Sequence, residues 1–392
     1  MKSVWLMLAL GVTLTGMNDS HARDTTTAPA ATSTGDDPFL WLEDIHGARA
    51  LDWVKRQNAT TAKRFVDNTE FAHTRDRILE VLDSEARIPY VNRMGDHLYN
   101  FWRDKAHPRG IWRRTTLAEY RKAEPAWELL LDLDALNQAE GKRWVFKGVQ
   151  CLKPAYERCL VSLSPDGGDA VAVREFSIPH KAFVKDGFVL PVAKSEVDWI
   201  DEDTLYVGTD FGPGSMTESI YPRIAKEWKR GTPLTAATTI YEGKPSDLAV
   251  SAHHDRTPGY ERDFVSVARD FYHSDLYQRL GDKLVRVEVP ADAEAEAHRD
   301  WLLVRTRSPW TVDGSTYPAG ALLAAPFDAF MAGKRQFTVL FQPDAHTSLD
   351  AYAWTRHHLI LNLMDDVKSR LEVLTPPQLA TPGGDWQRAA MA

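Results

Sequence analysis

The segment CLVSLSPDGGDAVAV, residues 159–173, carries the pattern that decides the fold. Two short apolar runs, Cys159–Leu163 and Ala170–Val173, flank a turn that is rich in Asp and Gly. Short apolar runs bounded by such turn residues are typical of β-strands that pair with each other. The segment therefore predicts two neighbouring strands, and the same pattern can be sought along the rest of the chain.

Similar runs follow one another from about residue 89 to the C-terminus. They are residues 97–102, 111–115, 127–131, 144–146, 204–207, 264–267, 284–287, 301–304, 321–324, 337–340, 359–363 and 371–374. Many short strands separated by turns favour a β-sandwich array or a β-propeller. A propeller blade takes about 40 to 50 residues, so this region would hold roughly six blades. The internal repeat is weak, because the turn Ser-Pro-Asp-Gly at Ser164 appears once.

A helical segment precedes the strands. It opens with a Pro-led turn at Asp37–Pro38 and continues as a helical pattern from Phe39 to about Leu82. The apolar positions in it recur at intervals near three and four, which predicts one buried helix face. These positions are Leu42, Ile45, Leu51, Val54 and Phe65. Trp41 and Trp53 add two large aromatic side chains, so we expect this helix to pack against a large partner.

The first residues have the features of a secretory signal peptide. Lys2 is followed by the apolar core Val4–Leu10, and Ser20-His21-Ala22 is a small-x-small cleavage site. The apolar core is shorter than the roughly 20 residues that a membrane-spanning helix needs, which favours a cleaved signal peptide over an uncleaved anchor. We therefore predict a signal peptide at residues 1–22 and a flexible linker at residues 23–36. The protein is expected to be exported, periplasmic or secreted, and free of the membrane after cleavage.

Charge and cysteine content limit the partners and the redox chemistry. The 392-residue chain has a formal net charge of -8 with interspersed charges, so we expect no nucleic-acid partner. Its two cysteines, Cys151 and Cys159, flank a hairpin-like connection that contains Pro154. In an exported chain this arrangement favours a structural disulfide over two buried free thiols. Redox or metal chemistry would need CxxC spacing or more ligands.

A further set of motifs resembles a known family. The segment Asp37–Asn58 is similar to the opening helix of the prolyl oligopeptidase family of serine peptidases, S9A. Motifs similar to the propeller of that family follow in order: Ser164–Asp169, Arg174–Phe176, Phe183–Phe188, Leu190–Pro191, Lys194–Ser195, Trp199, Gly208–Gly212, Tyr221–Arg223 and Trp228–Leu234. The resemblance implies a mainly β fold, with a helical segment at residues 37–88. A β-propeller of the seven-bladed type, which could be incomplete, would follow at residues 89–392.

The catalytic motif of that family is not found in this sequence. The resemblance implies an α/β-hydrolase domain after the propeller, with a Gly-x-Ser-x-Gly elbow followed by an acid and a His. The sequence contains no Gly-x-Ser-x-Gly, and the nearest segment, Gly212–Met216, has the wrong spacing around Ser215. The C-terminal part also lacks alternating strand and helix patterns. We therefore expect no catalytic residue and no α/β-hydrolase domain here, so that the chain would be truncated or its other half a separate polypeptide.

Other candidate sites are weaker. Adjacent histidines in a strand point to opposite faces, so hydrogen-bonded or surface histidines are favoured over a metal site at His253–His254 and His357–His358. Acidic loops at Asp201–Asp203 and Asp365–Asp366 could bind a cation, but such loops are usually solvated. We expect no metal site and no cofactor.

Glycine and arginine features are equally weak. Gly212-x-Gly214 has no following helix and is a poor phosphate cradle. Several arginines could meet peptide carboxylates or a missing domain, although solvated strand faces are favoured. They are Arg103, Arg109, Arg113, Arg114 and Arg256, which follows Asp255.

Two functional hypotheses follow. In the first, the resemblance implies the propeller part of an exported prolyl-oligopeptidase-like serine peptidase. The propeller would admit short proline-containing peptides, and the helix bearing Trp41 and Trp53 would pack on a hydrolase domain supplied in cis or in trans. This chain alone would then be inactive. In the second, the chain is a free-standing, non-catalytic propeller that binds a partner, and its aromatic helix face needs another place to pack.

Overall fold

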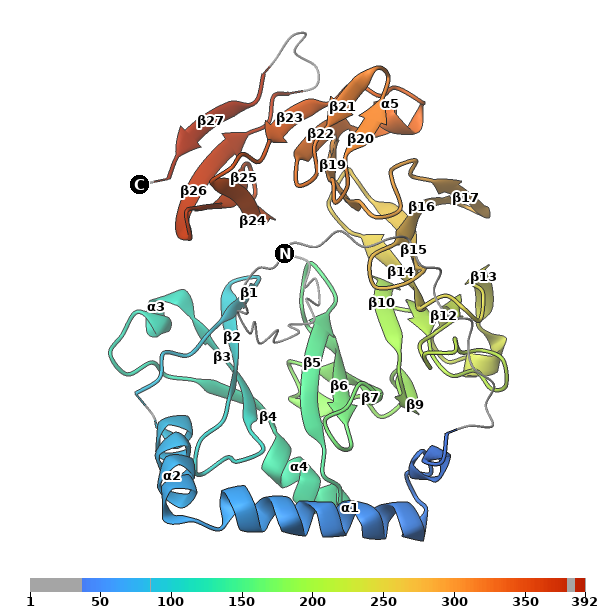
Figure 1. Cartoon of the computed structure of the whole chain (residues 1–392). Helices are drawn as coiled ribbons and strands as arrows, with labels where there is room; N and C mark the ends of the chain where they lie inside the picture. Colours follow the sequence, from blue (N-terminus) through green and yellow to red (C-terminus); the bar gives the residue numbers. More distant parts are fainter. Residues whose placement is uncertain (1–36, 85, 379–384, 392) are drawn as a thin grey trace, which may run out of the picture. The chain divides into compact units, whose positions relative to one another are not determined.

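The computed structural model describes residues 37–84, 86–378 and 385–391 (Figure 1). The predicted signal peptide at residues 1–22 and the predicted linker at residues 23–36 lie outside these residues. The chain divides into two compact units, with the boundary between Arg87 and Ile88. We call them the helical unit and the propeller unit and describe each by itself.

The helical unit consists of short helices, two of which follow each other directly. They are the 3-10 helix η1 (Leu40–Leu42), the α-helix α1 (Ala48–Thr61), the π-helical η2 (Ala62–Val66) and the α-helix α2 (Thr69–Asp83). The predicted continuous helix is therefore interrupted. Gly47 precedes α1 with extended backbone, and Asn68 caps α2 by accepting a hydrogen bond from the Phe71 N–H at 2.8 Å. Among the helices that the structure describes, none combines the length and apolarity needed to cross a membrane.

The apolar face predicted in the helical unit is exposed rather than buried. Ile45, Phe65 and Leu51 are 73%, 57% and 43% exposed, and Ala50 is the only buried residue of α1. The predicted packing of this face against a large partner stays a prediction, because two short helices cannot cover a wide apolar stripe by themselves. Within its own unit this face has no cover.

Among the described residues, the propeller unit contains six antiparallel sheets of four or five strands, the blades, which follow one another in chain order. Blades 1 to 3 consist of β1 (Asn92–Met94), β2 (His97–Trp102), β3 (Ile111–Thr116) and β4 (Glu128–Asp132); β5 (Val145–Cys151), β6 (Arg158–Ser164), β7 (Val171–Ser177), β8 (Ala182–Phe183) and β9 (Val189–Ala193); and β10 (Glu196–Asp201), β11 (Thr204–Gly208), β12 (Ile224–Lys229) and β13 (Thr238–Glu242). Blades 4 to 6 consist of β14 (Ala249–Asp255), β15 (Arg262–Ala268), β16 (Ser274–Leu280) and β17 (Lys283–Arg286); β18 (Glu294–His298), β19 (Trp301–Arg305), β22 (Leu322–Pro326) and β23 (Thr338–Phe341); and β24 (Thr347–Trp354), β25 (Leu359–Asp365), β26 (Lys368–Thr375) and β27 (Gln387–Ala390).

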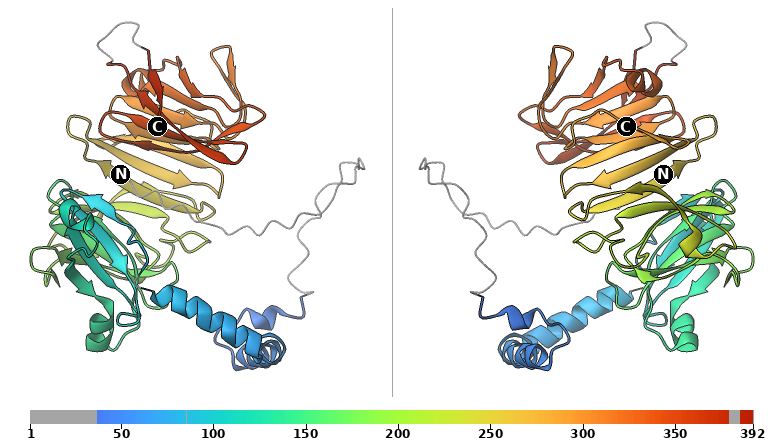
Figure 2. Two further views of the ribbon diagram at one scale, coloured as in Figure 1. Left: turned by 90° about the vertical axis from the view of Figure 1, so that its left-hand side faces the viewer. Right: turned by 90° about the vertical axis from the view of Figure 1, so that its right-hand side faces the viewer.

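Each blade is an antiparallel up-and-down sheet (Figure 2), and in blade 2 both β8 and β9 pair with β7. Blade 5 adds a hairpin between its second and third strands, formed by β20 (Trp310–Val312) and β21 (Ser315–Tyr317). The remaining helices lie in connections: α3 (Leu117–Tyr120), α4 (Leu133–Glu140), η3 (Leu234–Ala236) and α5 (Phe327–Met331).

The described residues form six blades rather than the seven that the family resemblance implies. The count of seven came from the resemblance and is corrected here. The length of the strand region is the reason, because at about 40 to 50 residues a blade it accommodates roughly six.

The core lies between successive blades rather than at one centre. Five apolar clusters each join two neighbouring blades, around Trp112, Trp199, Val265, Phe264 and Leu303. Phe264 and Val265 are adjacent in β15, and their side chains point to opposite faces, toward blade 5 and blade 3 respectively. Central strands are therefore apolar on both faces. Among the described residues, none of these clusters joins blade 6 to blade 1.

Candidate functional site

The serine nearest to an elbow motif belongs to a structural loop. Ser215 lies in the connection between β11 and β12 and is buried. Its hydroxyl oxygen lies 2.6 Å from the Gly212 carbonyl oxygen and accepts a hydrogen bond from the Phe211 N–H at 2.9 Å. In the same loop, Arg223 donates to the Gly214 carbonyl oxygen at 2.8 Å. A nucleophilic serine needs an adjacent base. The hydrogen bonds of Ser215 given above go to backbone groups of its own loop, so its role is to hold that loop.

The histidine pairs make separate contacts. In β14, His253 stacks on Phe264 with ring centroids 5.2 Å apart, whereas His254 Nδ1 lies 2.8 Å from an Asp263 oxygen. The pair His357–His358 lies in the turn between β24 and β25, so the expectation that both pairs lie in strands is wrong for this one. Across the residues that the structure describes, no group of three or more His, Cys, Asp or Glu side chains could hold a metal ion.

Side chains of the two acidic turns pair within the chain. Asp203, in the turn between β10 and β11, pairs with Arg230 at 2.9 Å. Asp366, in the turn between β25 and β26, lies 3.0 Å from His346 Nδ1. The partner of Asp203 follows β12 of the same blade, and the partner of Asp366 lies in the connection that leads into β24.

Three of the predicted arginines are held by protein groups, and one of them, Arg256, pairs with Asp198 at 3.6 Å. The Arg113 guanidinium lies between the rings of Trp102 and Trp127, at 4.6 and 4.2 Å from their centroids. Burial lowers the pKa of Arg113 to about 10. Arg114 donates to Glu128 at 2.6 Å. The expectation of solvated arginines is wrong for these three, because ring stacking and ion pairing shield them from water.

A polar cluster joins blades 3 and 4. Tyr206 of β11 donates to Asp263 of β15 at 2.7 Å, and the same Asp263 oxygen lies 2.8 Å from His254 Nδ1. Arg279 of β16 donates to the Tyr206 hydroxyl and to Glu227 of β12, both at 2.9 Å. We call these five residues the blade 3–4 seam.

Burial and hydrogen bonds set the ionisation of Tyr206 and Asp263 in the seam. Burial and the hydrogen bond to Asp263 raise the pKa of Tyr206. Burial opposes ionisation of Asp263, but hydrogen bonds from His254 and Tyr206 outweigh it and lower the pKa of Asp263. The tyrosine therefore stays protonated and donates to an ionised carboxylate.

Two cavities lie beside the seam. The larger, of ≈ 400 Å³, is lined by Ile200, Asp201, Thr204, Tyr206, Glu227, Lys229, Asp263, Arg279 and Gly281. The smaller, of ≈ 370 Å³, is lined by Leu152, Lys153, Pro154, Ala155, Glu157, Arg158, Ile200, Asp201, Glu202, His254, Arg256 and Glu261. Acidic and basic side chains line both cavities, so neither selects ligands of one charge. No serine or cysteine is among these lining residues.

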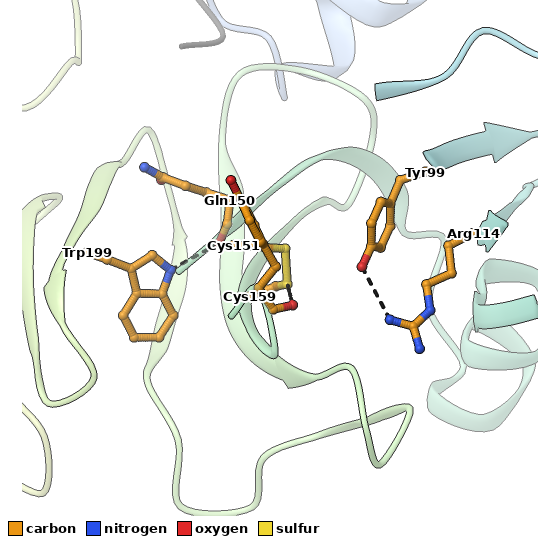
Figure 3. The surroundings of a disulfide bond; sticks show 7 residues. Tyr99, Arg114, Gln150, Cys151, Cys159 and Trp199 are labelled. Atoms are coloured by element: carbon orange, nitrogen blue, oxygen red, sulfur yellow. Dashed lines mark hydrogen bonds between the residues drawn. A yellow bond between two sulfur atoms is a disulfide. The ribbon is translucent and has the colours of Figure 1, made fainter. Parts of the chain in front are cut away.

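The Cys151–Cys159 disulfide closes the connection that lines the smaller cavity (Figure 3). The two residues face each other across β5 and β6, with sulfur atoms 1.99 Å apart. Beside them, Trp199 Nε1 donates to the Gln150 carbonyl oxygen at 3.0 Å, which ties blade 3 to blade 2. The disulfide thus holds a hairpin next to a contact between blades.

The helical unit presents many apolar side chains. Trp41 and Trp53 form an edge-to-face pair with ring centroids 6.4 Å apart, and the Arg49 guanidinium lies 4.1 Å from the Trp41 centroid. Further exposed apolar residues lie on α1, η2 and α2, namely Leu51, Val54, Phe65, Val66, Phe71, Ile78, Leu79, Val81 and Leu82. We call Trp53 and these nine residues the helical apolar surface. Exposed apolar surface of this extent usually marks an interaction site.

Reasoning from the sequence missed the blade 3–4 seam. Its residues come from different strands, and Tyr206 and Arg279 are 73 positions apart. Nothing local in the sequence marks such a pair, because only the stacking of two blades brings them together.

Comparison with known proteins identifies a family for most of the chain. The family model for the N-terminal beta-propeller domain of prolyl oligopeptidase matches residues 20–380. An uncharacterized peptidase of Sinorhizobium fredii is 34% identical over 352 residues, which cover 87% of this chain and 48% of the relative. An uncharacterized peptidase of Rickettsia prowazekii is 29% identical over 354 residues, and the match covers 86% of this chain and 49% of that relative.

The fold is also similar to that of a solved structure. A post-proline cleaving enzyme from Rickettsia typhi superposes with a TM-score of 0.82 at 28% identity. The match covers 90% of this chain and 53% of that enzyme. The chain therefore spans about half the length of the relatives it matches.

Proposed function

This chain belongs to the prolyl oligopeptidase family, whose N-terminal β-propeller domain it matches, and from that premise we propose that it is the propeller part of an exported serine peptidase. The substrates of this peptidase are short proline-containing peptides. The observation that carries the proposal is the likeness to the Rickettsia typhi post-proline cleaving enzyme over 90% of the chain. The propeller admits short peptides to the catalytic site and holds back larger chains.

The catalytic residues of this peptidase lie outside the residues described here. About half of each relative lies beyond the matched part, and we place an α/β-hydrolase domain with Ser, an acid and His there, in cis or in trans. The lack of a Gly-x-Ser-x-Gly in the sequence supports this placement of the catalytic residues. On this proposal the chain alone is inactive.

The helical apolar surface packs on that hydrolase domain. Its exposure supports this, because covering apolar side chains stabilises a complex by about 25 cal/mol for each Å² removed from water. Trp53 is the largest side chain of this surface, and Trp41 packs against it edge to face. A free-standing binding protein, the alternative function, would leave this surface in water.

Export is part of the proposal. The predicted signal peptide at residues 1–22 supports it, and so does the Cys151–Cys159 disulfide, because such bonds persist in oxidising compartments.

Joining the two halves tests the proposal. The chain is expressed in one polypeptide with the part of the Sinorhizobium fredii relative that it does not match, and hydrolysis of a short proline-containing peptide is measured. We expect cleavage after proline that an organophosphorus serine reagent abolishes. Cleavage that survives the serine reagent, or no cleavage by the joined protein, contradicts the proposed function.

A further inference from the structure

We propose that the smaller cavity binds a zwitterionic ligand, either a free amino acid or a short peptide with free ends. The cavity lies where blades 2, 3 and 4 present the same kind of connection, the one between their first and second strands. Most of its lining comes from these connections, at residues 152–157, 202–203 and 256–261. The inference goes beyond the proposed function, because the site needs no residue outside this chain.

Contacts between the three blades hold the walls of the cavity in place. The buried Asp198 of β10 accepts hydrogen bonds from the Gln150 side chain of β5 and from the His254 N–H of β14, the latter at 2.8 Å. The Cys151–Cys159 disulfide ties together the two ends of the first connection (Figure 3). Walls that are fixed beforehand reduce the entropy that is lost when a ligand binds.

Arg256 lines the cavity with a guanidinium whose donors the protein does not fully match. Its Nη1 makes long contacts, at 3.3 Å to the His254 carbonyl oxygen and 3.6 Å to an Asp198 oxygen. Nε and Nη2 are buried and have no hydrogen-bond partner among the residues that the structure describes. Buried donors without acceptors cost stability, and a carboxylate matches two guanidinium donors at once. Because the Nη1 contacts are long, the guanidinium can turn toward a carboxylate in the cavity at little cost.

The carboxylates of the lining suit an ammonium group. Glu157, Glu202 and Glu261 are exposed, and their side chains form no ion pair with the part of the chain that the structure describes. An exposed carboxylate without a partner attracts a cation at no cost in lost contacts. Acidic and basic side chains are nearly balanced in this lining, so a ligand with one charge of each sign fits it better than a ligand with a single charge.

Free amino acids and short peptides with free ends have this chemistry. Each carries one carboxylate and one ammonium group close together, whereas the backbone inside a long polypeptide carries neither. Hydrolysis of a peptide bond produces one new carboxylate and one new ammonium group, so the products of a peptidase belong to this class. The cavity volume of ≈ 370 Å³ lies within the range of sites for small molecules.

Calorimetric titration of the purified chain tests the site. Alanine and alanylalanine are the zwitterionic probes, and N-acetylalanylalanine amide, which carries no charge, is the control ligand. We expect saturable binding of a zwitterionic probe at one site and no binding of the uncharged peptide. Saturation by alanylalanine alone assigns the site to short peptides, and saturation by alanine assigns it to free amino acids. No saturation by either zwitterion, or equal binding of the uncharged peptide, overturns the proposal.

Two substitutions and a matched control locate the binding. Arg256→Gln removes the guanidinium and should weaken binding of the zwitterion about tenfold. Glu202→Gln removes an exposed carboxylate and should weaken it roughly threefold. This second variant tests the site even if Arg256→Gln does not fold, because the Glu202 side chain makes no buried contact. Glu124→Gln, an exposed position before β4 in blade 1, should leave the affinity unchanged.

The outcomes are independent of the proposed function. Unchanged affinity in Arg256→Gln and Glu202→Gln, or an equal loss in Glu124→Gln, overturns the site. Cleavage of a proline-containing peptide by the joined protein tests the proposed function separately, because the titrations use the chain alone.

Discussion

Arg113 illustrates how a charged side chain can stabilise a blade. It lies between the Trp102 and Trp127 rings and donates to Asn100 Oδ1 at 3.0 Å. Removing a shielded cation–π contact and one hydrogen bond costs about 2 kcal/mol. We therefore predict that Arg113→Ala lowers the free energy of unfolding by about 2 kcal/mol in urea denaturation.

A matched control separates stacking from charge in that experiment. Arg370 is half-exposed and pairs with Glu372 at 3.7 Å. Arg370→Ala is expected to change the free energy of unfolding by less than about 1 kcal/mol. Equal effects of the two substitutions would contradict the role given to the tryptophan rings.

Glu128 provides a pH-dependent contribution. Hydrogen bonds from Arg114 and Lys181 lower its pKa from the ordinary 4.5 to about 2. Because the folded-state pKa is depressed, the stabilisation is present above about pH 4.5 and is lost as the pH falls toward 2. Urea unfolding of the native protein and of Glu128→Gln should differ more at about pH 7 than at about pH 2.5. A difference that stays constant between these pH values would contradict this account.

At the scale of residues, the sequence predicted contacts within one strand or hairpin better than contacts between distant parts of the chain. The opposite contacts of His253 and His254 follow from strand geometry, and the pairing of Cys151 with Cys159 is local to one hairpin. The environment of Arg113 was not predicted, because it depends on Trp127, which lies in the connection before the next strand, β4. The blade 3–4 seam was missed for the same reason.

Central strands were the predictable elements. Runs such as Trp301–Val304 and Leu205–Val207 are buried on both faces, and they read as continuous apolar segments. Strands such as β12 and β14 were not predicted, because polar side chains interrupt their apolar runs. The helical segment was predicted as one element. The structure interrupts it at Gly47 and Asn68, and the spacing of the apolar residues gave no sign of these breaks.

The β5–β6 hairpin offers a prediction at the scale of elements. The disulfide joins residues separated by 8 positions, and closing a loop of this length stabilises a fold by about 2 to 3 kcal/mol. The double variant Cys151→Ala and Cys159→Ala is expected to lose that much free energy of unfolding in urea. A reductant should destabilise the native protein and leave the double variant unaffected. Equal sensitivity of both proteins to reductant would contradict a structural role for the bond.

The whole molecule combines a stacked propeller with a helical unit that does not cover its own apolar surface. The fold class, the helices at the N-terminus and the family were predictable, because strand runs and motifs follow one another in order. The length of the strand region predicted roughly six blades, as the described residues form, whereas the seven implied by the resemblance were wrong.

The helical apolar surface predicts how the isolated chain behaves. An apolar dye such as 1-anilinonaphthalene-8-sulfonate should bind the chain, and the variant Leu79→Ser with Leu82→Ser should reduce its fluorescence roughly twofold. The control variant Val189→Ser with Val192→Ser removes side chains of similar exposure from the propeller unit. An equal loss in both variants would contradict a special role for the helical unit.

Export gives a prediction on the intact chain. Expression in a Gram-negative host should yield a periplasmic protein that begins at Arg23, because Ser20-His21-Ala22 precedes the predicted cleavage site. Mass spectrometry of the N-terminal peptide checks this result. Recovery of the uncleaved chain from the cytoplasm would contradict export.

The most direct test of the central claim is the rate at which the purified chain alone hydrolyses a short proline-containing peptide. If it is the propeller part of a post-proline peptidase, the rate equals that of buffer, and cleavage begins only when the hydrolase half is joined to it. Turnover by the chain alone, sensitive to a serine reagent, would show that the catalytic residues lie within these 392 residues and would contradict the account.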